Sequence, residues 1–364
     1  MTHSELSRRD FLKAGFGVAL GTATGILTLD AVGWPTMPKK ALVSIVKIKK
    51  DKIGYAVEEA IDLLGGIKTV AKGKERIMLK PNLVAESLDS TTKREVIKTL
   101  SVLMKASGRE VLIGEGSAAV GGFNVKQGET YRTRNEAILN GMQQYVFDRL
   151  GYTELAHSIH VPLINLHSGE MVEVSVPGAF IFDKITLHRS LTEIDMLCSV
   201  PMMKTHVLAG VTLGMKNLIG LYPGSVYGSV RAGVHDRAAH AGSHGVAFEI
   251  VDMVRANKLG LVVVDGSTAM QGNGPMEGSL VKMGVIVAGT NPLATDMVAA
   301  RIMGFNTNEI PTFTYAQRVG MKPSSFDEIE IMGERISDVA RMFKKPAVVS
   351  WQSISPVWGV KEMQ

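Results

Sequence analysis

Short runs of apolar residues recur along the chain, separated by longer segments with helical periodicity. Many of these runs are nearly continuous apolar segments of four to seven residues, which is typical of strands buried on both faces of a sheet. We therefore expect strands at residues 41–48, 76–79, 110–113, 161–166, 172–176, 180–187, 194–200, 259–264, 285–288 and 328–332.

Between several of these runs, apolar residues stand three and four positions apart, as on one face of a helix. We expect helices at residues 53–64, 92–106, 134–150, 246–256, 294–303 and 310–319. Alternating strands and helices are typical of an α/β fold, so we predict a mostly parallel or mixed sheet flanked by helices. The region near residues 160–190 has only strand-like runs, which predicts an antiparallel extension.

The first residues have the pattern of an export signal. Residues 7–13, Ser-Arg-Arg-Asp-Phe-Leu-Lys, look like a twin-arginine motif, and residues 14–29 carry no charge. That apolar run is shorter than the roughly 20 residues of a membrane-spanning helix. We expect residues 1–33 to be a signal peptide for the twin-arginine translocation machinery. A single α/β domain, residues 34–364, would then work in the periplasm or another extracytoplasmic compartment, unless an uncleaved signal anchors it to the membrane.

Charge and cysteine content narrow the function classes. The net charge is +5 over 364 residues, without a long basic tract or a repeated basic–aromatic pattern, so nucleic acid is not an expected partner. The single cysteine, Cys198, excludes an intramolecular disulfide. It also excludes an iron–sulfur cluster held by this chain alone, which needs about four thiolates. Cys198 lies in an apolar run, which predicts a buried, inert thiol.

Five of the expected strands end in polar or glycine-rich turns. In open α/β sheets, ligands usually bind beyond the carboxyl ends of strands. One such turn is common, but five together predict a shared binding site. The turns are residues 80–82 (Lys-Pro-Asn), 114–117 (Gly-Glu-Gly-Ser), 201–206 (Pro-Met-Met-Lys-Thr-His), 265–266 (Asp-Gly) and 289–292 (Gly-Thr-Asn-Pro).

These segments resemble the DUF362 family of uncharacterised proteins. The resemblance spans about residues 75–304 and rests on Leu79–Val84, Ile113–Gly116, Pro201–His206, Thr212–Gly220, Val264–Gly266, Gly272–Pro275 and Ala288–Asp296. It implies a DUF362-like domain but no established reaction. Many family members also carry a cysteine-rich ferredoxin-type module, which this chain lacks.

Cationic and amide side chains in these motifs are the candidate ligand-binding residues. Lys80, Lys204 and Lys216 offer positive charge to a carboxylate or phosphate, while Asn82 and Asn217 offer orienting hydrogen bonds. The alternative is that each lysine pairs with a structural carboxylate, because structural ion-pair networks imitate binding sites.

Three further residues are candidates for proton transfer. Glu115 and Asp265 are acid–base candidates, because carboxylates near lysines take different roles in different environments. His206 is the best-placed proton shuttle in the sequence. The sequence lacks a dinucleotide fingerprint, a P-loop and a Gly-x-Ser-x-Gly elbow, so we do not expect a nicotinamide enzyme, a P-loop NTPase or an α/β-hydrolase.

A glycine- and serine-rich segment, residues 220–245, has the composition of a long loop and holds a histidine cluster. His235, His240 and His244 are candidate ligands of a divalent metal such as Zn²⁺. The alternative is a solvated loop without a metal.

Two functions fit these observations. The first is an exported protein that binds a small anionic ligand at the strand ends, either as an enzyme or as a binding protein. The second is a non-catalytic binding or redox-partner module that docks a separate iron–sulfur subunit.

Overall fold

The computed structural model of the chain describes residues 40–231, 234, 245–346 and 360–362, which belong to one compact unit. The predicted signal peptide, residues 1–33, lies outside these residues, so its role stays a prediction. Among the residues described, helices are all too short or too polar to cross a bilayer.

A mostly parallel sheet forms the centre of this unit. Its continuous path runs in the order β15-β1-β14-β12-β9-β2-β3-β6. In this path β14 runs antiparallel to both of its neighbours, while β12, β9, β2, β3 and β6 are parallel. The predicted fold class is therefore confirmed. The strand bounds are β1 Ala41–Lys47, β2 Arg76–Pro81, β3 Glu110–Glu115, β6 Leu163–Asn165, β9 Met196–Val200, β12 Leu259–Gln271, β14 Val285–Gly289 and β15 Ile329–Gly333.

Side chains of the sheet alternate between two separate buried clusters, one on each face. In β2, Ile77 and Leu79 belong to one cluster and Met78 to the other. In β12, Leu261 and Val262 divide in the same way. Because the strands are buried on both faces, their sequences are nearly continuous runs of apolar residues.

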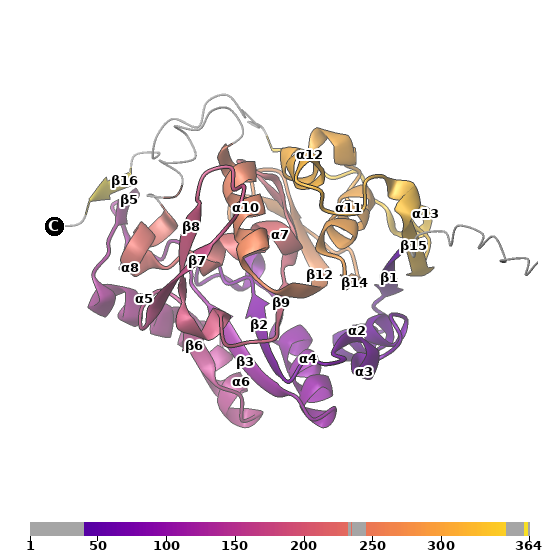
Figure 1. Cartoon of the computed structure of the whole chain (residues 1–364), viewed down its shortest axis with the longest axis horizontal. Helices are drawn as coiled ribbons and strands as arrows, with labels where there is room; N and C mark the ends of the chain where they lie inside the picture. Colours follow the sequence, from indigo (N-terminus) through magenta and orange to yellow (C-terminus); the bar gives the residue numbers. More distant parts are fainter. Residues whose placement is uncertain (1–39, 232–233, 235–244, 347–359, 363–364) are drawn as a thin grey trace, which may run out of the picture. The chain divides into compact units, whose positions relative to one another are not determined.

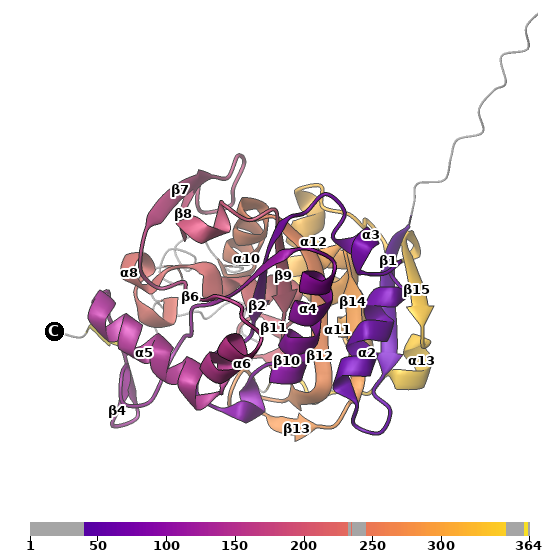
Figure 2. The same cartoon turned by 90° about the horizontal axis from the view of Figure 1, so that it is seen from below.

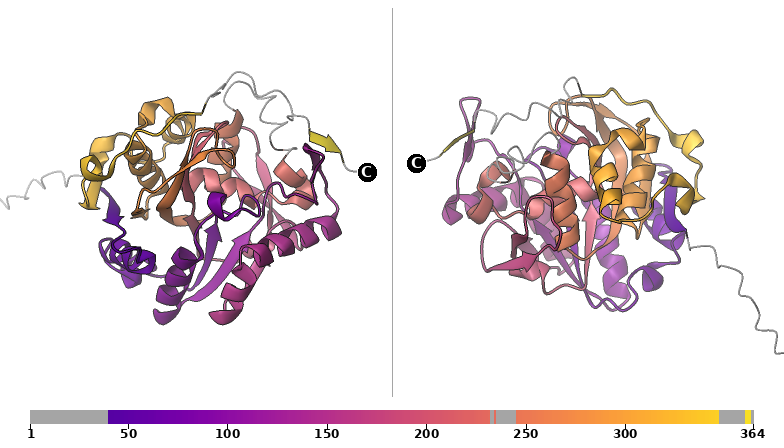
Figure 3. Two further views of the ribbon diagram at one scale, coloured as in Figure 1. Left: turned by 180° about the vertical axis from the view of Figure 1, so that it is seen from behind. Right: turned by 45° about the horizontal axis from the view of Figure 1, so that its top comes forward.

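Helices cover both faces of the sheet. One layer contains α2 (Ile53–Asp62), α4 (Arg94–Ala106), α5 (Glu136–Arg149) and α6 (Tyr152–Ser158). The other contains α7 (Gly214–Asn217), α10 (Gly245–Ala256), α11 (Pro292–Ile302) and α12 (Pro311–Arg318). Figure 1 shows α10, α11 and α12 above the sheet, and Figure 2 brings α2, α4 and α6 to the front. The right-hand view of Figure 3 brings the orange and yellow helices of the second layer forward.

The predicted antiparallel part near residues 160–190 is present as a hairpin of β7 (Met171–Ser175) and β8 (Lys184–His188). This hairpin forms its own two-stranded sheet, while β6 extends the central sheet in parallel. The smaller remaining elements are α3 Ile67–Val70, β4 Val125–Lys126, β5 Glu129–Arg132, α8 Gly224–Tyr227, α13 Ile336–Val339 and β16 Val360–Glu362.

The chain continues as strand at two points where the sequence predicts turns. After β9, a hairpin of β10 (Met202–His206) and β11 (Gly210–Thr212) leaves the main path. Strand β12 extends seven residues past Val264, because β10 and β13 (Ser279–Val281) pair with that extension. The prediction of a strand end at Asp265 is therefore wrong.

A second predicted strand end lies away from the others. Strand β14 ends at Gly289, before the turn that contains Asn291 and Pro292. Because β14 is antiparallel to β1 and β12, its carboxyl end is at the opposite edge of the sheet from theirs. The Asn291 side chain accepts a hydrogen bond from Ala294 N and so caps helix α11.

Candidate functional site

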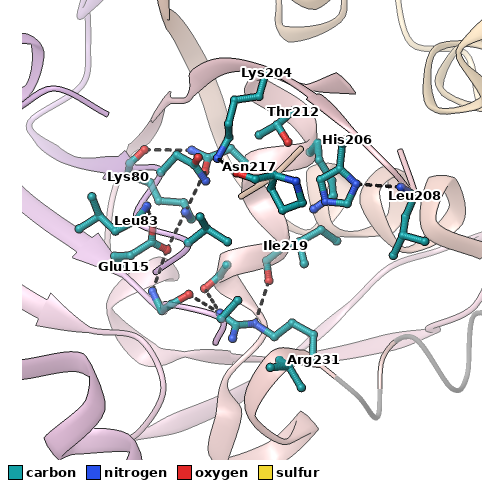
Figure 4. Close-up of a pocket in the computed structure, with 18 of the residues that line it drawn as sticks. Lys80, Leu83, Glu115, Lys204, His206, Leu208, Thr212, Asn217, Ile219 and Arg231 are labelled. Carbon is teal, nitrogen blue, oxygen red and sulfur yellow. Dashed lines mark hydrogen bonds and ion pairs between the residues drawn. The ribbon is translucent and has the colours of Figure 1, made fainter. Parts of the chain in front are cut away.

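A cavity of about 230 Å³ lies at the carboxyl ends of β2 and β3. The hairpin β10–β11, helix α7 with the turn after it, Val230, Arg231 and Pro275 supply further lining residues. Figure 4 shows Lys80 and Glu115 on one side, His206 and Leu208 on the other, and Arg231 below. The predicted site residues that line the cavity are Lys80, Asn82, Glu115, Lys204, His206, Lys216 and Asn217.

Lys80 and Glu115 form a buried ion pair on one wall of the cavity. Lys80 Nζ lies 2.7 Å from Glu115 Oε1, and the side chains are 1% and 2% exposed. The Glu115 carboxylate also accepts hydrogen bonds of 2.8 Å from the backbone N–H groups of Leu83 and Gly116. Burial lowers the pKa of Lys80, and the nearby Glu115 carboxylate opposes that shift. Glu115 is therefore the counter-charge of Lys80. The alternative, in which each lysine pairs with a structural carboxylate, holds for this lysine.

Asn217 connects this ion pair to the rest of the site. Its Oδ1 accepts hydrogen bonds from Lys80 Nζ at 3.1 Å and from Asn82 Nδ2 at 3.2 Å. Its Nδ2 donates to Lys80 O at 3.1 Å and to Ser199 Oγ at 3.0 Å. The Asn217 amide thereby joins α7 to the ends of β2 and β9.

A buried carboxylate outside the cavity holds α7 in place. Asp296 on α11 accepts hydrogen bonds of 2.8 Å from the N–H groups of Gly214 and Met215, in the first turn of α7. Burial raises the pKa of Asp296 to about 7, and the two hydrogen bonds oppose the shift. Asp296 therefore positions the helix that carries Lys216 and Asn217, and among the described residues its recorded partners are these two N–H groups and not a lysine.

The hairpin β10–β11 places three polar side chains on one face. Lys204 and His206 are two residues apart on β10, and Thr212 lies opposite Lys204 in the pairing register. Lys204 Nζ donates to Ser90 O at 2.8 Å and, more weakly, to Pro275 O at 3.4 Å. All three side chains line the cavity.

The His206 ring has a defined orientation. Its Nδ1 accepts hydrogen bonds from Leu208 N at 3.0 Å and Ala209 N at 3.2 Å. In the neutral ring, the proton is therefore on Nε2. His206 lines the cavity, in agreement with its predicted place in the site, and its proposed role in proton transfer stays a prediction.

Burial and mutual repulsion lower the pKa values of two lysines in the cavity. The pKa of Lys204 falls to about 7, through burial and the nearby ammonium groups of Lys216 and Lys80. The pKa of Lys216 falls to about 8 through burial, with the Glu249 carboxylate opposing the shift. Neither Lys204 nor Lys216 forms an ion pair with any residue that the structure describes. Both groups therefore titrate close to neutral pH.

Arg231 is a site residue that the sequence did not reveal. Its guanidinium is 2% exposed and donates to the carbonyl oxygens of Ser117 at 3.0 Å, Ile219 at 3.2 Å, Gly220 at 3.2 Å and Gly116. These bonds join the end of β3 to the turn after α7. Arg231 lies in the glycine-rich segment predicted as a loop, where no pattern distinguished it from the other basic residues.

Two polar atoms of the cavity wall have no hydrogen-bond partner among the residues that the structure describes. They are Asn82 Oδ1 and Thr212 Oγ1, and both are buried. A buried polar group without a partner costs about 1–3 kcal/mol. A ligand that donates a hydrogen bond to either atom would recover part of that cost.

Asp265, a predicted acid–base candidate, is not among the residues that line the cavity. Its carboxylate accepts hydrogen bonds from Lys93 N at 2.8 Å, Ser267 N at 3.0 Å and Ser267 Oγ at 2.6 Å. Burial raises the pKa of Asp265, and these bonds oppose the shift. Asp265 thus fixes β12 to the residue that precedes α4, which is a structural role.

The predicted metal ligands His235, His240 and His244 lie outside the described residues. Within the described part of the chain, no group of three or more His, Cys, Asp or Glu side chains is arranged to hold a metal ion. Cys198 is fully buried, as predicted, and burial raises the pKa of its thiol. The divalent-metal hypothesis therefore stays a prediction, and elemental analysis of the purified protein tests it.

Sequence comparison relates most of the chain to known proteins. The family described as Domain of unknown function (DUF362) matches residues 77–301. These residues include all the described residues that line the cavity. A thylakoid-associated protein of Synechocystis sp. is 25% identical over 270 residues, which cover 73% of this chain and 74% of that protein.

Comparison with solved structures gives weaker similarities. The lactate racemase apoprotein from Thermoanaerobacterium thermosaccharolyticum matches with a TM-score of 0.43 and 11% identity over 72% of this chain. A protein from Thermotoga maritima matches with a TM-score of 0.38 and 14% identity over 73% of the chain. The matches cover 57% and 59% of those two proteins, less than two thirds of either.

Proposed function

The chain belongs to the DUF362 family, and from the cavity that this family region encloses we propose that the protein binds a small anionic molecule. The observation that carries the proposal is the excess of cationic over anionic side chains in the cavity wall. Lys80, Lys204, Lys216 and Arg231 line it, and Glu115 is the one carboxylate among its described lining residues. Because Glu115 is already paired with Lys80, no described lining carboxylate is left for the other three cations, and the Glu249 carboxylate that acts on Lys216 is not a lining residue.

The size of the cavity and the chemistry of its wall narrow the ligand class. A cavity of about 230 Å³ is smaller than the roughly 300–1,000 Å³ of drug-sized ligand pockets. Charge-assisted hydrogen bonds from lysine to carboxylate or phosphate are stronger than neutral ones. Asn82 Oδ1 offers an acceptor for a hydroxyl or amine donor. A small carboxylate or phosphate fits the first two features, and a hydroxyl or amino group, carried by the ligand or formed from it in the site, would use the third.

The binding experiment combines a thermal-shift screen of such anions with calorimetric titration of any that raise the melting temperature. Loss of a charge-assisted hydrogen bond costs about 1.5–3 kcal/mol, so Lys216→Met should weaken binding roughly 10- to 100-fold. Lys282→Met is the matched control, because Lys282 is 75% exposed and pairs with Asp51 at the surface. The control should bind as the wild type does.

Two results contradict the proposal. The first is a screen in which no carboxylate or phosphate stabilises the folded wild-type protein. The second is an equal loss of affinity in Lys216→Met and Lys282→Met, which would place the bound anion elsewhere.

The pKa values of Lys204 and Lys216 add a pH test of the same site. Both amines are protonated below pH 7 and lose their charge as the pH rises through about 7 and about 8. Affinity for a carboxylate should therefore fall as the pH rises from 6 to 9, by roughly tenfold or more for each lost charge contact. Titrations at several pH values measure this slope, and a constant affinity across the range argues against contact with these lysines.

A further inference from the structure

The surroundings of Lys204 differ from those of Lys80 in the number of acceptors around the nitrogen. Lys80 Nζ has three acceptors, Glu115 Oε1 at 2.7 Å, Pro81 O at 2.9 Å and Asn217 Oδ1 at 3.1 Å. Three acceptors match the three hydrogens of an ammonium group. Within the described residues, Lys204 Nζ has two, the carbonyl oxygens of Ser90 and Pro275, and no carboxylate.

Two acceptors match the two hydrogens of a neutral amine. When these hydrogens bond to Ser90 O and Pro275 O, the nitrogen lone pair takes the remaining tetrahedral direction. The Lys204 side chain lines the cavity and is itself fully buried, so its amine is largely desolvated before a ligand binds. An amine desolvated next to other cations is the form in which lysine acts as a nucleophile.

The other groups of the cavity supply what such a nucleophile needs. Lys216 offers a cation for a carboxylate, and its charge contributes to the lowered pKa of Lys204. Thr212 lies across the hairpin from Lys204, and its Oγ1 has no partner among the described residues. The hydroxyl of Thr212 is thus on the same face as the amine, where an oxygen leaving a carbonyl carbon would need a hydrogen-bond donor.

We propose that Lys204 forms a reversible imine with a small 2-oxo acid whose carboxylate pairs with Lys216. This inference rests on the proposed anion-binding function and names the ligand class of that site. A carboxylate next to a carbonyl is the smallest ligand that presents an anion to one lysine and an electrophilic carbon to another. The cavity of about 230 Å³ suits ligands of this size.

The chemistry of the step is a condensation without any change of oxidation state. The lone pair of the neutral Lys204 amine attacks the carbonyl carbon, forming a C–N bond and a carbinolamine. The carbinolamine oxygen retains one proton from the amine and takes a second from solvent, then leaves as water. The product is a protonated imine on Nζ, and hydrolysis by water reverses the reaction.

The test is reductive trapping. Wild-type protein is incubated with glyoxylate, pyruvate or 2-oxobutyrate and sodium cyanoborohydride, and the products are analysed by intact-mass and peptide-mapping mass spectrometry. We expect a saturable single adduct on Lys204 that forms faster at pH 8 than at pH 6. Acetate, which has the carboxylate but no ketone or aldehyde group, should give no adduct.

Two variants separate this inference from the anion site itself. Lys204→Arg keeps a positive charge but cannot form the imine, so it should bind pyruvate in calorimetric titration and give no adduct. Lys282→Met should give the wild-type adduct. Peptide mapping of the wild type identifies the modified lysine even if Lys204→Arg does not fold.

Each outcome decides the proposal. If pyruvate or glyoxylate binds in titration but no adduct forms on Lys204, the imine is wrong and the anion site stands. Adducts spread over surface lysines, with no preference for Lys204, also overturn it. If none of the 2-oxo acids binds or is trapped while another carboxylate or phosphate binds, the ligand class is wrong. If no anion binds at all, the proposed function fails with it.

Discussion

At the residue scale, the cavity contains three lysines with different roles set by their immediate neighbours. Lys80 has a carboxylate at 2.7 Å, Lys204 has two backbone carbonyls, and Lys216 has no hydrogen bond within the described residues. Since burial penalises charge in all three, only the neighbours distinguish a structural ion pair from an amine that titrates near neutrality. This contrast gives two predictions on stability.

The first prediction is that Lys80→Met strongly destabilises the protein. The substitution leaves the Glu115 carboxylate buried without its cation, which should cost about 3–5 kcal/mol in the free energy of unfolding. Urea unfolding followed by circular dichroism measures this cost. Lys80→Met combined with Glu115→Leu should recover part of it, because the double variant removes the uncompensated charge. If Lys80→Met lowers the free energy of unfolding by no more than an ordinary surface substitution does, the Lys80–Glu115 ion pair is not structural.

The second prediction is that Lys204→Met raises stability in a pH-dependent way. The folded pKa of Lys204 is about 7, below the 10.5 of an exposed lysine, so the unfolded chain binds more protons between these values. The stability of the wild type therefore rises with pH across that window, and the cost of burying the charge is fully present below pH 7.

Lys204→Met removes that cost, so its advantage over the wild type should be largest at pH 6 and shrink by pH 9. At pH 6 we expect the melting temperature of the variant to exceed that of the wild type by at least about 2–4 °C. Scanning calorimetry at both pH values measures the difference. A variant that is destabilised as much as Lys80→Met would show that Lys204 has a charged partner in the folded protein.

At the element scale, the site depends on two features that the apolar pattern of the sequence did not predict. The hairpin β10–β11 presents Lys204, His206 and Thr212 on one face, because residues two apart on a strand point the same way. The extension of β12 past Val264 gives this hairpin a parallel partner, and it contains Asp265, which accepts a hydrogen bond from Lys93 N just before α4. Asp265 therefore lies outside the cavity, where its carboxylate stabilises the start of helix α4.

The third prediction tests that structural role. Asp265→Ala removes the acceptor for Lys93 N, Ser267 N and Ser267 Oγ, and should cost about 1–3 kcal/mol in the free energy of unfolding. Anion affinity at a temperature where the variant is folded should stay within about twofold of the wild type. If the variant instead has normal stability but lower ligand affinity, Asp265 takes part in ligand binding.

At the scale of the whole molecule, the parallel sheet brings distant segments to one edge. Lys80 and Asn217 are 137 positions apart, yet their side chains are hydrogen bonded because β2 and β9 are neighbours and α7 packs beside them. The proposed anion site therefore depends on the complete domain. We expect fragments that contain only part of the sheet to lack it.

The fourth prediction concerns the cellular localisation of the protein. We propose that residues 1–33 direct export by the twin-arginine route, since they pair the Arg8-Arg9 motif with a short uncharged apolar run. Replacing both arginines by lysine should leave the full-length precursor in the cytoplasm, with little or none in the extracytoplasmic fraction. Lys13→Arg, which keeps the charge and the twin arginines, should be exported normally. Export of the double variant at the wild-type level would contradict the proposal.

Much of the fold follows from local patterns. The ten predicted strands and six predicted helices all correspond to elements of the structure, since a continuous apolar run or a helical apolar face is a property of neighbouring residues. Seven of the eight predicted catalytic and ligand-binding residues line one cavity, because the carboxyl ends of parallel strands share an edge.

The sequence by itself thus determined the α/β class, the main strands and helices, and the motifs that supply the site. Only the tertiary structure decided that Glu115 neutralises Lys80, that Arg231 lines the cavity, and that Asp265 lies outside it. The physical reason is that these outcomes depend on distances between segments far apart in the chain. Burial and the nearest charge, which set the pKa and the role of each lysine, exist only after the sheet and its helices have packed.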